Sequence, residues 1–264
     1  MSFVIQSTTN KSPHHNLNED SHFIGDNLII VADGMGGESS GDIASKIAVE
    51  TVSELLKRPL SDVISDNEAR ELLFSSISQA DKAISDYIEK HPASAGMGTT
   101  ILIAIIRENN MYMAWCGDSH CFLFREGYVM SRTKDHSYVQ ELIDADRITV
   151  EESFTHPDNN LITRYVGGGE GTCVPDYTSC QINVGDIFIF CSDGLSGYCR
   201  HEDIRKCISS NINTQNLPVC LMKLAKSPGS DDDITIVTLT DNEQKGKHSS
   251  SFWNWLKQKM RTSV

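Results

Sequence analysis

The sequence predicts an α+β protein in which groups of antiparallel strands alternate with pairs of helices. Apolar runs of strand length come in neighbouring pairs, and two of them, at 21–25 and 28–32, are separated only by a tight Asp26-Asn27 turn. Long helical periodicity is confined to two stretches, at about 41–90 and 201–226. Strands and helices therefore do not alternate one by one, as they do in a doubly wound sheet.

The elements follow in order along the chain. Three strands come first, and then two helices that end before Pro59 and Pro92. Two strands flank the turn at 108–110, another ends at the Glu126-Gly127 turn, and a short helix is expected near Asp135. The expected strands are 3–7, 21–25, 28–32, 99–107, 111–116, 121–125, 187–191 and 234–240, and the longer helices are 41–57, 67–90, 201–210 and 215–226.

The composition is that of a single folded domain. The 264 residues are 39% hydrophobic and 22% charged, which is ordinary for a globular protein that buries a substantial core. The longest apolar run, 101–106, is too short to cross a bilayer, and the N-terminus has no basic region followed by an apolar core. We therefore expect a cytoplasmic protein.

Cysteine spacing and net charge narrow the function classes. The eight cysteines form no CxxC pair and several lie in apolar segments, so we expect buried free thiols rather than a disulfide framework. The net charge of -13 argues against nucleic-acid binding, which requires basic surfaces, but it allows a carboxylate-lined cation site.

A change of charge marks a domain boundary near residue 240. Residues 241–264 carry five Lys/Arg against two Asp/Glu, whereas the first 240 residues carry 18 against 34. On a helix, Trp253, Leu256 and Met260 would share one face of this basic tail. The tail is either a terminal helix packed on the domain or a docking element for a partner protein or an anionic membrane.

Acidic residues recur where expected strands begin or end. Asp33 follows a buried apolar run, and a carboxylate in such a place needs a partner or a metal ion. Taken singly, each Asp-Gly is also a plain turn. Together they would repel one another unless cations compensate. The acidic junctions are Glu19 and Asp20, Asp33, Asp118, Asp193, and Asp231 to Asp233.

The ligand chemistry points to hard divalent ions. Carboxylate oxygens favour magnesium, manganese or calcium, and the sequence has no HExxH, no Cys/His metal spacing and no EF-hand loop. Two divalent ions that share a carboxylate hold a hydroxide for in-line attack on phosphorus, which requires no side-chain nucleophile. A nucleotide-cradling reading of GMGG fails because no Lys-Ser/Thr follows the glycines.

The motifs together resemble a known family. In order they are NED, ADGMGG, GMGTT, GDS, KDHS, NLITRYVGG, GD, CSDGLSG and SDDDIT. This series, over about residues 1–240, is similar to the metal-dependent serine/threonine protein phosphatases of type 2C, especially the bacterial form. The resemblance implies a four-layer α-β-β-α sandwich with two central, mainly antiparallel sheets flanked by helix pairs. It also implies two Mn²⁺ or Mg²⁺ ions and a possible third.

The resemblance assigns the core metal ligands. Asp33 would bridge both ions and the Gly34 carbonyl would bind one of them, while Asp193 and Asp232 would bind the other. A metal-bridging water or hydroxide would then attack the phosphate directly.

Further positions match the outer part of the family's metal site. Glu19 would hold metal-bound water, with Asp20 beside it. Asp118 matches the position that, with Asp193, binds a third and weaker ion in bacterial members. Asp233 stands where the family often has Asn and still offers an oxygen.

Two departures concern the substrate. Bacterial members usually have Arg four residues before the Glu of NED, where it binds the substrate phosphate, and this chain has His15 there. An imidazole cannot make the bidentate contact of a guanidinium, so phosphate affinity is expected to be weaker unless another cation substitutes. The position after Gly34 is Met35 rather than a His that could protonate the leaving group, as in other bacterial members.

Other polar residues have ordinary explanations. Asp135-His136-Ser137 fits a helix start with Asp as the cap better than a catalytic dyad, and Thr99-Thr100 fits the start of a core strand. Arg164 could contact substrate or form an internal salt bridge. The charged segment 144–160 lies where the family has a mobile flap, although by its sequence it is only a polar loop.

The leading interpretation is hydrolysis of phosphoserine and phosphothreonine in phosphoprotein substrates, within a bacterial signalling system that includes a cognate Ser/Thr kinase. The protein is expected to be a monomer. The alternative is a weakly active or inactive phosphatase-like regulator or scaffold, whose only support is His15.

Overall fold

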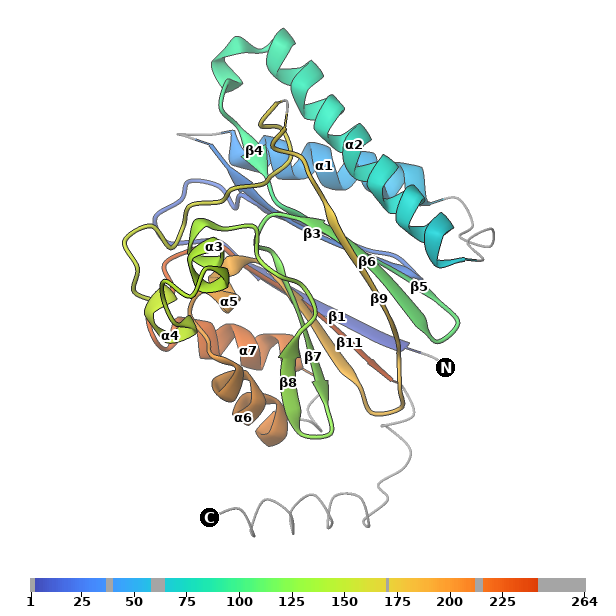
Figure 1. Cartoon of the computed structure of the whole chain (residues 1–264), viewed down its shortest axis with the longest axis vertical. Coiled ribbons are helices and arrows are strands. Elements are labelled where there is room, and N and C mark those ends of the chain that lie inside the picture. The colour runs from blue at the N-terminus through green and yellow to red at the C-terminus, as the bar shows by residue number, and fades with distance from the viewer. Residues whose placement is uncertain (1–2, 37–39, 58–64, 170, 212–215, 242–264) are drawn as a thin grey trace.

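Two stacked antiparallel sheets form the centre of the molecule (Figure 1). The structure is a computed structural model, and it describes residues 3–36, 40–57, 65–169, 171–211 and 216–241. One sheet has the order β1-β11-β10-β7-β8, with β1 Phe3–Asn10, β11 Ile234–Asp241, β10 Ile187–Cys191, β7 His120–Arg125 and β8 Tyr128–Ser131. The other has the order β2-β3-β5-β6-β9, with β2 Asp20–Ile24, β3 Leu28–Met35, β5 Ile101–Arg107, β6 Asn110–Cys116 and β9 Asp176–Gln181, while β4 Gly98–Thr99 pairs with β3.

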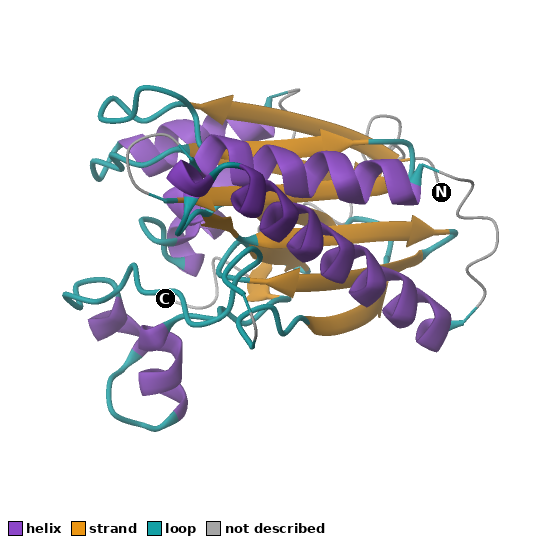
Figure 2. Ribbon diagram, turned by 90° about the horizontal axis from the view of Figure 1, so that it is seen from above, coloured by secondary structure: helices purple, strands orange, loops and turns teal. Residues whose placement is uncertain are grey.

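Helices cover the outer face of each sheet. Seen from above in Figure 2, the two long helices lie over the strands of one sheet. These are α1 (Gly41–Leu56) and α2 (Asp66–Lys90), which pack on the sheet that contains β3, while α6 (His201–Asn211) and α7 (Leu217–Lys226) pack on the other sheet. The remaining helices are short: 3₁₀ turn η2 (Pro92–Ser94), α3 (Tyr138–Asp144), α4 (Val150–Ser153) and α5 (Asp193–Ser196).

Three apolar layers separate these four structural layers. Ile29 and Val31 of β3 point between the sheets, where they pack with Phe188 and Phe190 of β10. Their neighbour Ile30 points the other way, into the layer beneath α1 and α2. A strand with a covered face on both sides reads as a continuous apolar run, and this is why β3 and β5 were recognisable in the sequence. The α+β class and the two antiparallel sheets are confirmed.

Element boundaries agree with the sequence to within a few residues for the long elements. α2 begins one residue before its predicted start because Ser65 and Glu68 form a capping box. The predicted Asp135 cap is wrong: α3 is capped by Ser137, whose hydroxyl accepts a hydrogen bond from the Gln140 amide at 3.3 Å. The strands β8 and β9 and the short helices α4 and α5 were not predicted.

The last described strand, β11, runs through Asp241, one residue beyond the predicted limit of the domain at residue 240. The domain boundary itself stays a prediction. The tail interpretation, including the face formed by Trp253, Leu256 and Met260, concerns residues outside those that the structure describes and stays a prediction. Among the described residues, no helix combines the length and apolar character needed to cross a membrane.

Candidate metal centre

The first carboxylates of the site come from neighbouring strands. Asp20 of β2 stands directly opposite Asp33 of β3 in the antiparallel register. Thr100 fixes the backbone at Asp33, because its amide donates to the Asp33 carbonyl at 2.8 Å and its hydroxyl accepts from the Asp33 amide at 2.9 Å. The Thr99 hydroxyl donates to the same carbonyl at 2.9 Å. The two threonines of the GMGTT motif therefore position the end of β3.

The second sheet contributes the other carboxylates and is tied to the first by one serine. Asp193 opens α5 immediately after β10, and Asp232 lies just before β11. Ser192 donates to Asp20 at 2.8 Å and accepts from the Thr235 amide at 2.9 Å. This contact joins the ends of β2, β10 and β11, so acidic residues far apart in the chain lie within electrostatic reach of one another.

Burial and mutual repulsion raise the pKa values of these carboxylates, as expected at a site that binds a cation. Burial raises the pKa of Asp33 well above its usual range, and the charges of Asp20, Asp193, Asp232 and Asp118 raise it further. Burial likewise raises the pKa of Asp20 to about 8 and that of Asp193 to about 7. Desolvation and repulsion both favour the neutral acid, so a bound cation would restore the carboxylates to their charged form.

Several carboxylate oxygens at the site have no protein partner. Within the described residues, Oδ1 of Asp20, Oδ1 of Asp118 and Oδ1 of Asp193 are buried and accept no hydrogen bond. A buried oxygen without a donor is costly, and a hard cation is the ligand that such oxygens prefer. The donor set therefore fits magnesium or manganese.

Glycines allow the chain to close around these acids. A Cβ atom on Gly34 would lie 2.0 Å from the Gly41 carbonyl oxygen, and one on Gly194 would lie 2.1 Å from that of Asp233. Both positions require glycine for close backbone approach. In the described part of the chain, no three Asp, Glu, His or Cys side chains already stand in a geometry ready to hold a metal ion. The assignment of individual ligands is therefore a proposal.

Asp233 anchors the loop before β2. Its carboxylate is fully buried and accepts from the Ser12 amide and the Glu19 amide, each at 2.6 Å, and its Oδ2 lies 3.0 Å from Nδ1 of His15. With both oxygens engaged, Asp233 holds this loop against the start of β11. Its predicted role as a metal ligand stays a prediction.

The anchored loop places Glu19 and His15 beside the acidic group. The Glu19 carbonyl accepts from the Gly34 amide at 3.1 Å and from the Ser45 hydroxyl at 2.6 Å, which ties the loop to β3 and α1. The hydrogen bond with Asp233 raises the pKa of His15, and its side chain is 37% exposed. His15 is therefore positioned at the rim of the site with its protonated form favoured.

An open cavity of about 570 Å³ adjoins the carboxylates and is lined by Asp118, Asp193 and Asp232. Its opposite wall includes residues of α3, the short helix expected near Asp135, and of the segment 144–160, which was expected to be a polar loop but contains the short helix α4. Arg200 fastens α4 across the cavity, since its guanidinium pairs with Glu151 and lies 4.9 Å from the centre of the Phe154 ring.

The structure adds to the site Asp135, which the sequence analysis had assigned to a helix cap, and His120, which it had not considered. Asp135 lies close enough to Asp118 and Asp193 for its charge to raise their pKa values. His120 contacts Asp135 through Nδ1 at 2.6 Å and lines the same cavity. The only available signal was the acidic residue of the KDHS motif, which was read as a helix cap.

Two other polar positions are structural. Arg164 donates to Asp176 at 3.2 Å, which is the internal salt bridge considered from the sequence. His136 bonds the Gly117 amide at 3.1 Å and Asp176 at 3.2 Å, so it supports the turn before Asp118. All eight cysteines are free thiols, as expected.

Comparison with known proteins gives concordant results. The protein phosphatase 2C model matches residues 14–217. The serine/threonine protein phosphatase PstP of Mycobacterium tuberculosis is 33% identical over 221 residues, which make up 83% of this chain and 41% of that protein. This chain therefore spans about two fifths of the length of that relative. The serine/threonine phosphatase stp of Listeria innocua is 31% identical over 243 residues, or 90% of this chain and 95% of that protein.

A solved structure agrees with the sequence relatives. The catalytic domain of serine/threonine protein phosphatase PstP, crystallised in complex with 2 manganese ions, superposes with a TM-score of 0.79 at 30% identity, over 90% of this chain and 99% of that one. The region matched by the family model contains Glu19, Asp20, Asp33, Asp118 and Asp193. The chain belongs to the protein phosphatase 2C family.

Proposed function

We propose that this protein is a metal-dependent phosphatase that removes phosphate from phosphoserine and phosphothreonine in other proteins. The observation that carries the proposal is the convergence of Asp20, Asp33, Asp118 and Asp193 from the ends of two sheets, all with raised pKa values. Three of them, Asp20, Asp118 and Asp193, also have a buried oxygen without a hydrogen-bond partner. Membership of the phosphatase family supports the same reading.

The proposed core ligands are Asp33, the Gly34 carbonyl, Asp193 and Asp232, with Glu19 acting through water. Asp118 and Asp193 would hold a third ion. Asp20 would lie beside Glu19, next to the metal ligands. A manganese complex is known for a related catalytic domain. When bound, such ions supply an activated water and neutralise the phosphoryl oxygens.

The remaining residues position substrate and site. The Asp233 carboxylate holds the loop that carries His15, and this supports a role in which the protonated ring would donate to the substrate phosphate. The cavity beneath α3 and α4 would receive the peptide around the phosphorylated residue. Since phosphoserine and phosphothreonine are made by protein kinases, the chain would oppose a Ser/Thr kinase.

Turnover of a phosphothreonine peptide, measured with manganese and with excess chelator, tests the proposal. We expect turnover only with the metal, and manganese binding by calorimetry that weakens strongly in Asp193→Ala. Metal binding without turnover would favour the regulator or scaffold instead. Full turnover in excess chelator would exclude a metal-dependent mechanism.

A further inference from the structure

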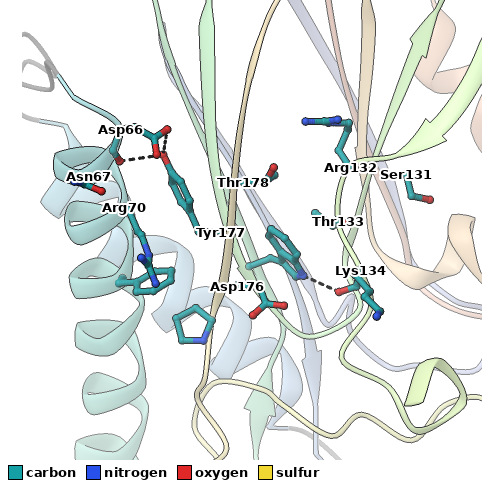
Figure 3. Close-up of a pocket in the computed structure, with 13 residues that line it drawn as sticks. Asp66, Asn67, Arg70, Ser131, Arg132, Thr133, Lys134, Asp176, Tyr177 and Thr178 are labelled. Carbon is teal, nitrogen blue, oxygen red and sulfur yellow. Dashed lines mark hydrogen bonds between the residues drawn. The ribbon is translucent and has the colours of Figure 1, made fainter. Parts of the chain in front are cut away.

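A second open cavity, of about 700 Å³, follows the outer edge of β9. β9 is the last strand of its sheet and pairs only with β6 among the described residues. Figure 3 shows this edge between two walls, α2 on one side and the segment 131–134 on the other. An edge strand presents unpaired backbone N–H and C=O groups, so this cavity offers a hydrogen-bonding template for another extended chain.

The two walls correspond to the two faces of β9. Tyr177 points to the α2 side, where its hydroxyl donates to Asp66 at 2.9 Å. Side chains alternate along a strand, so Thr178 and Cys180 point to the opposite side. Arg132 lies on that side, close enough to Cys180 for its positive charge to oppose the burial that raises the pKa of this thiol. An added strand would therefore have one wall on each of its own faces.

Each wall carries an arginine that has no carboxylate partner among the described residues. Arg70 on α2 lies 5.1 Å from the centre of the Phe74 ring, and Nε of Arg132 is buried without a hydrogen bond. Figure 3 shows the two side chains on opposite sides of the strand.

The other charged groups that line this cavity already have a hydrogen-bonding or ionic partner within the protein. Asp66 is bonded by Tyr177, and Asp176 is bonded by His136 and Arg164. Lys134 pairs with Asp144 at 2.5 Å. Arg70 and Arg132 are thus the positive charges of this cavity that no described carboxylate neutralises, in a chain whose net charge is -13. Asp66 keeps its own negative charge, because Tyr177 is a neutral donor.

We propose that β9 is a docking edge for an acidic extended segment of a partner protein. The segment would add to the sheet as a further strand, with main-chain hydrogen bonds to β9, and would direct acidic side chains alternately towards Arg70 and Arg132. The net charge of -13 disfavours non-specific binding of an acidic segment to the chain. The proposal does not depend on the phosphatase activity.

The test uses a fluorescein-labelled peptide, Gly-Thr-Glu-Glu-Val-Glu-Glu-Thr-Gly, and measures fluorescence anisotropy at low salt. Adjacent glutamates supply charge to both faces of the added strand. We expect binding that weakens about three- to tenfold in Arg70→Ala and in Arg132→Ala, and more in the double variant. Arg205→Ala, which removes an arginine from α6, is the matched control and should bind like the native protein. Thermal unfolding of each variant reports whether it folds.

Two further measurements distinguish strand addition from simple charge attraction. Hydrogen–deuterium exchange should slow at residues 176–181 when the peptide binds. A peptide with proline in place of Thr and Val keeps its charge but lacks three amide donors, and it should bind markedly more weakly. Equal affinity for the proline peptide, undiminished binding by the folded double variant, or protection confined to another segment would each overturn the proposal.

Discussion

The molecule has two clefts that differ in how the fold makes them: a carboxylate cleft lined by Asp118, Asp193 and Asp232, and an arginine cleft lined by Arg70 and Arg132. The carboxylate cleft lies where strand ends from both sheets meet, so its charges are desolvated and repel one another. The arginine cleft lies along the side of a single edge strand, with its charges on separate walls. Because electrostatic energies grow as water is excluded, the first cleft should tolerate almost no change and the second should respond gradually.

The two clefts also share a wall. Trp115 lines the arginine cleft at the end of β6, and Asp118 lines the carboxylate cleft three residues later. On the neighbouring segment, Lys134 lines the arginine cleft and the next residue, Asp135, lines the carboxylate cleft. The Trp115 indole donates to the Lys134 carbonyl at 2.8 Å and joins the two sides of this wall.

The largest effect is expected from the carboxylate cleft. Asp33→Asn and Asp193→Ala should each lower kcat on a phosphothreonine peptide by on the order of a thousandfold or more, because several kcal/mol of transition-state stabilisation depends on the bound ions. Asp86→Asn, on the exposed surface of α2, is the matched control. A loss of less than tenfold in a folded Asp33→Asn protein would mean that Asp33 does not hold a metal ion.

The pH dependence of stability tests the same cleft without catalysis. The folded pKa of Asp20 is raised to about 8, above an unfolded value of about 3.9, so folding favours the neutral acid. The stability of the metal-free protein from this group is therefore complete below about pH 4 and is lost as pH rises towards 8. Manganese should reverse that loss, since a cation favours the ionised form.

The measurement is the thermal midpoint in chelator and in manganese, at pH values across this range. Asp20→Asn cannot ionise, so the decline with pH in chelator should be smaller than in the native protein. An identical decline in both proteins would show that Asp20 is not the titrating group.

These two regions were not equally visible in the sequence. β3 and β5 are covered on both faces, so their unbroken apolar runs located them to within a few residues. The Asp33 and Asp193 junctions were visible because a carboxylate directly after such a run is unusual. The edge strand β9, DYTSCQ, has neither apolar continuity nor clean alternation, since one edge and part of each face meet solvent. The sequence therefore could not predict the arginine cleft along β9.

What the sequence could not show depends on contacts between distant residues. The hydrogen bond of Asp233 with the Glu19 amide spans 214 positions, so no local pattern reveals that both of its oxygens are engaged. The approach of Asp135 to Asp118 depends on how β8 returns along β7. The helices α4 and α5 are only four residues long, so the sequence cannot show a helical repeat of apolar residues there.

A smaller effect should separate the phosphate contact from the metal ions. His15→Arg would place a permanent charge at the rim of the carboxylate cleft, where the imidazole now bonds Asp233. We expect the KM for a phosphopeptide to fall by up to about tenfold, the equivalent of one charge-assisted hydrogen bond. The raised pKa of His15 implies that the native KM increases as pH rises and the ring loses its proton, whereas the arginine variant should not follow this trend. An unchanged KM with the native pH profile would place another cation at the phosphate.

The smallest effect concerns the wall between the clefts. Trp115→Phe keeps an aromatic ring but removes the donor to the Lys134 carbonyl, so the free energy of unfolding in urea should fall by about 1 kcal/mol. Tyr177→Phe is the matched control, because it removes a hydrogen bond on the α2 side only. If the wall is merely structural, Trp115→Phe should change phosphopeptide turnover and acidic-peptide affinity by less than about threefold, as expected for separate sites. A larger change in turnover, accompanied by a changed manganese affinity and absent from Tyr177→Phe, would show that the Trp115–Lys134 contact positions the neighbouring carboxylates.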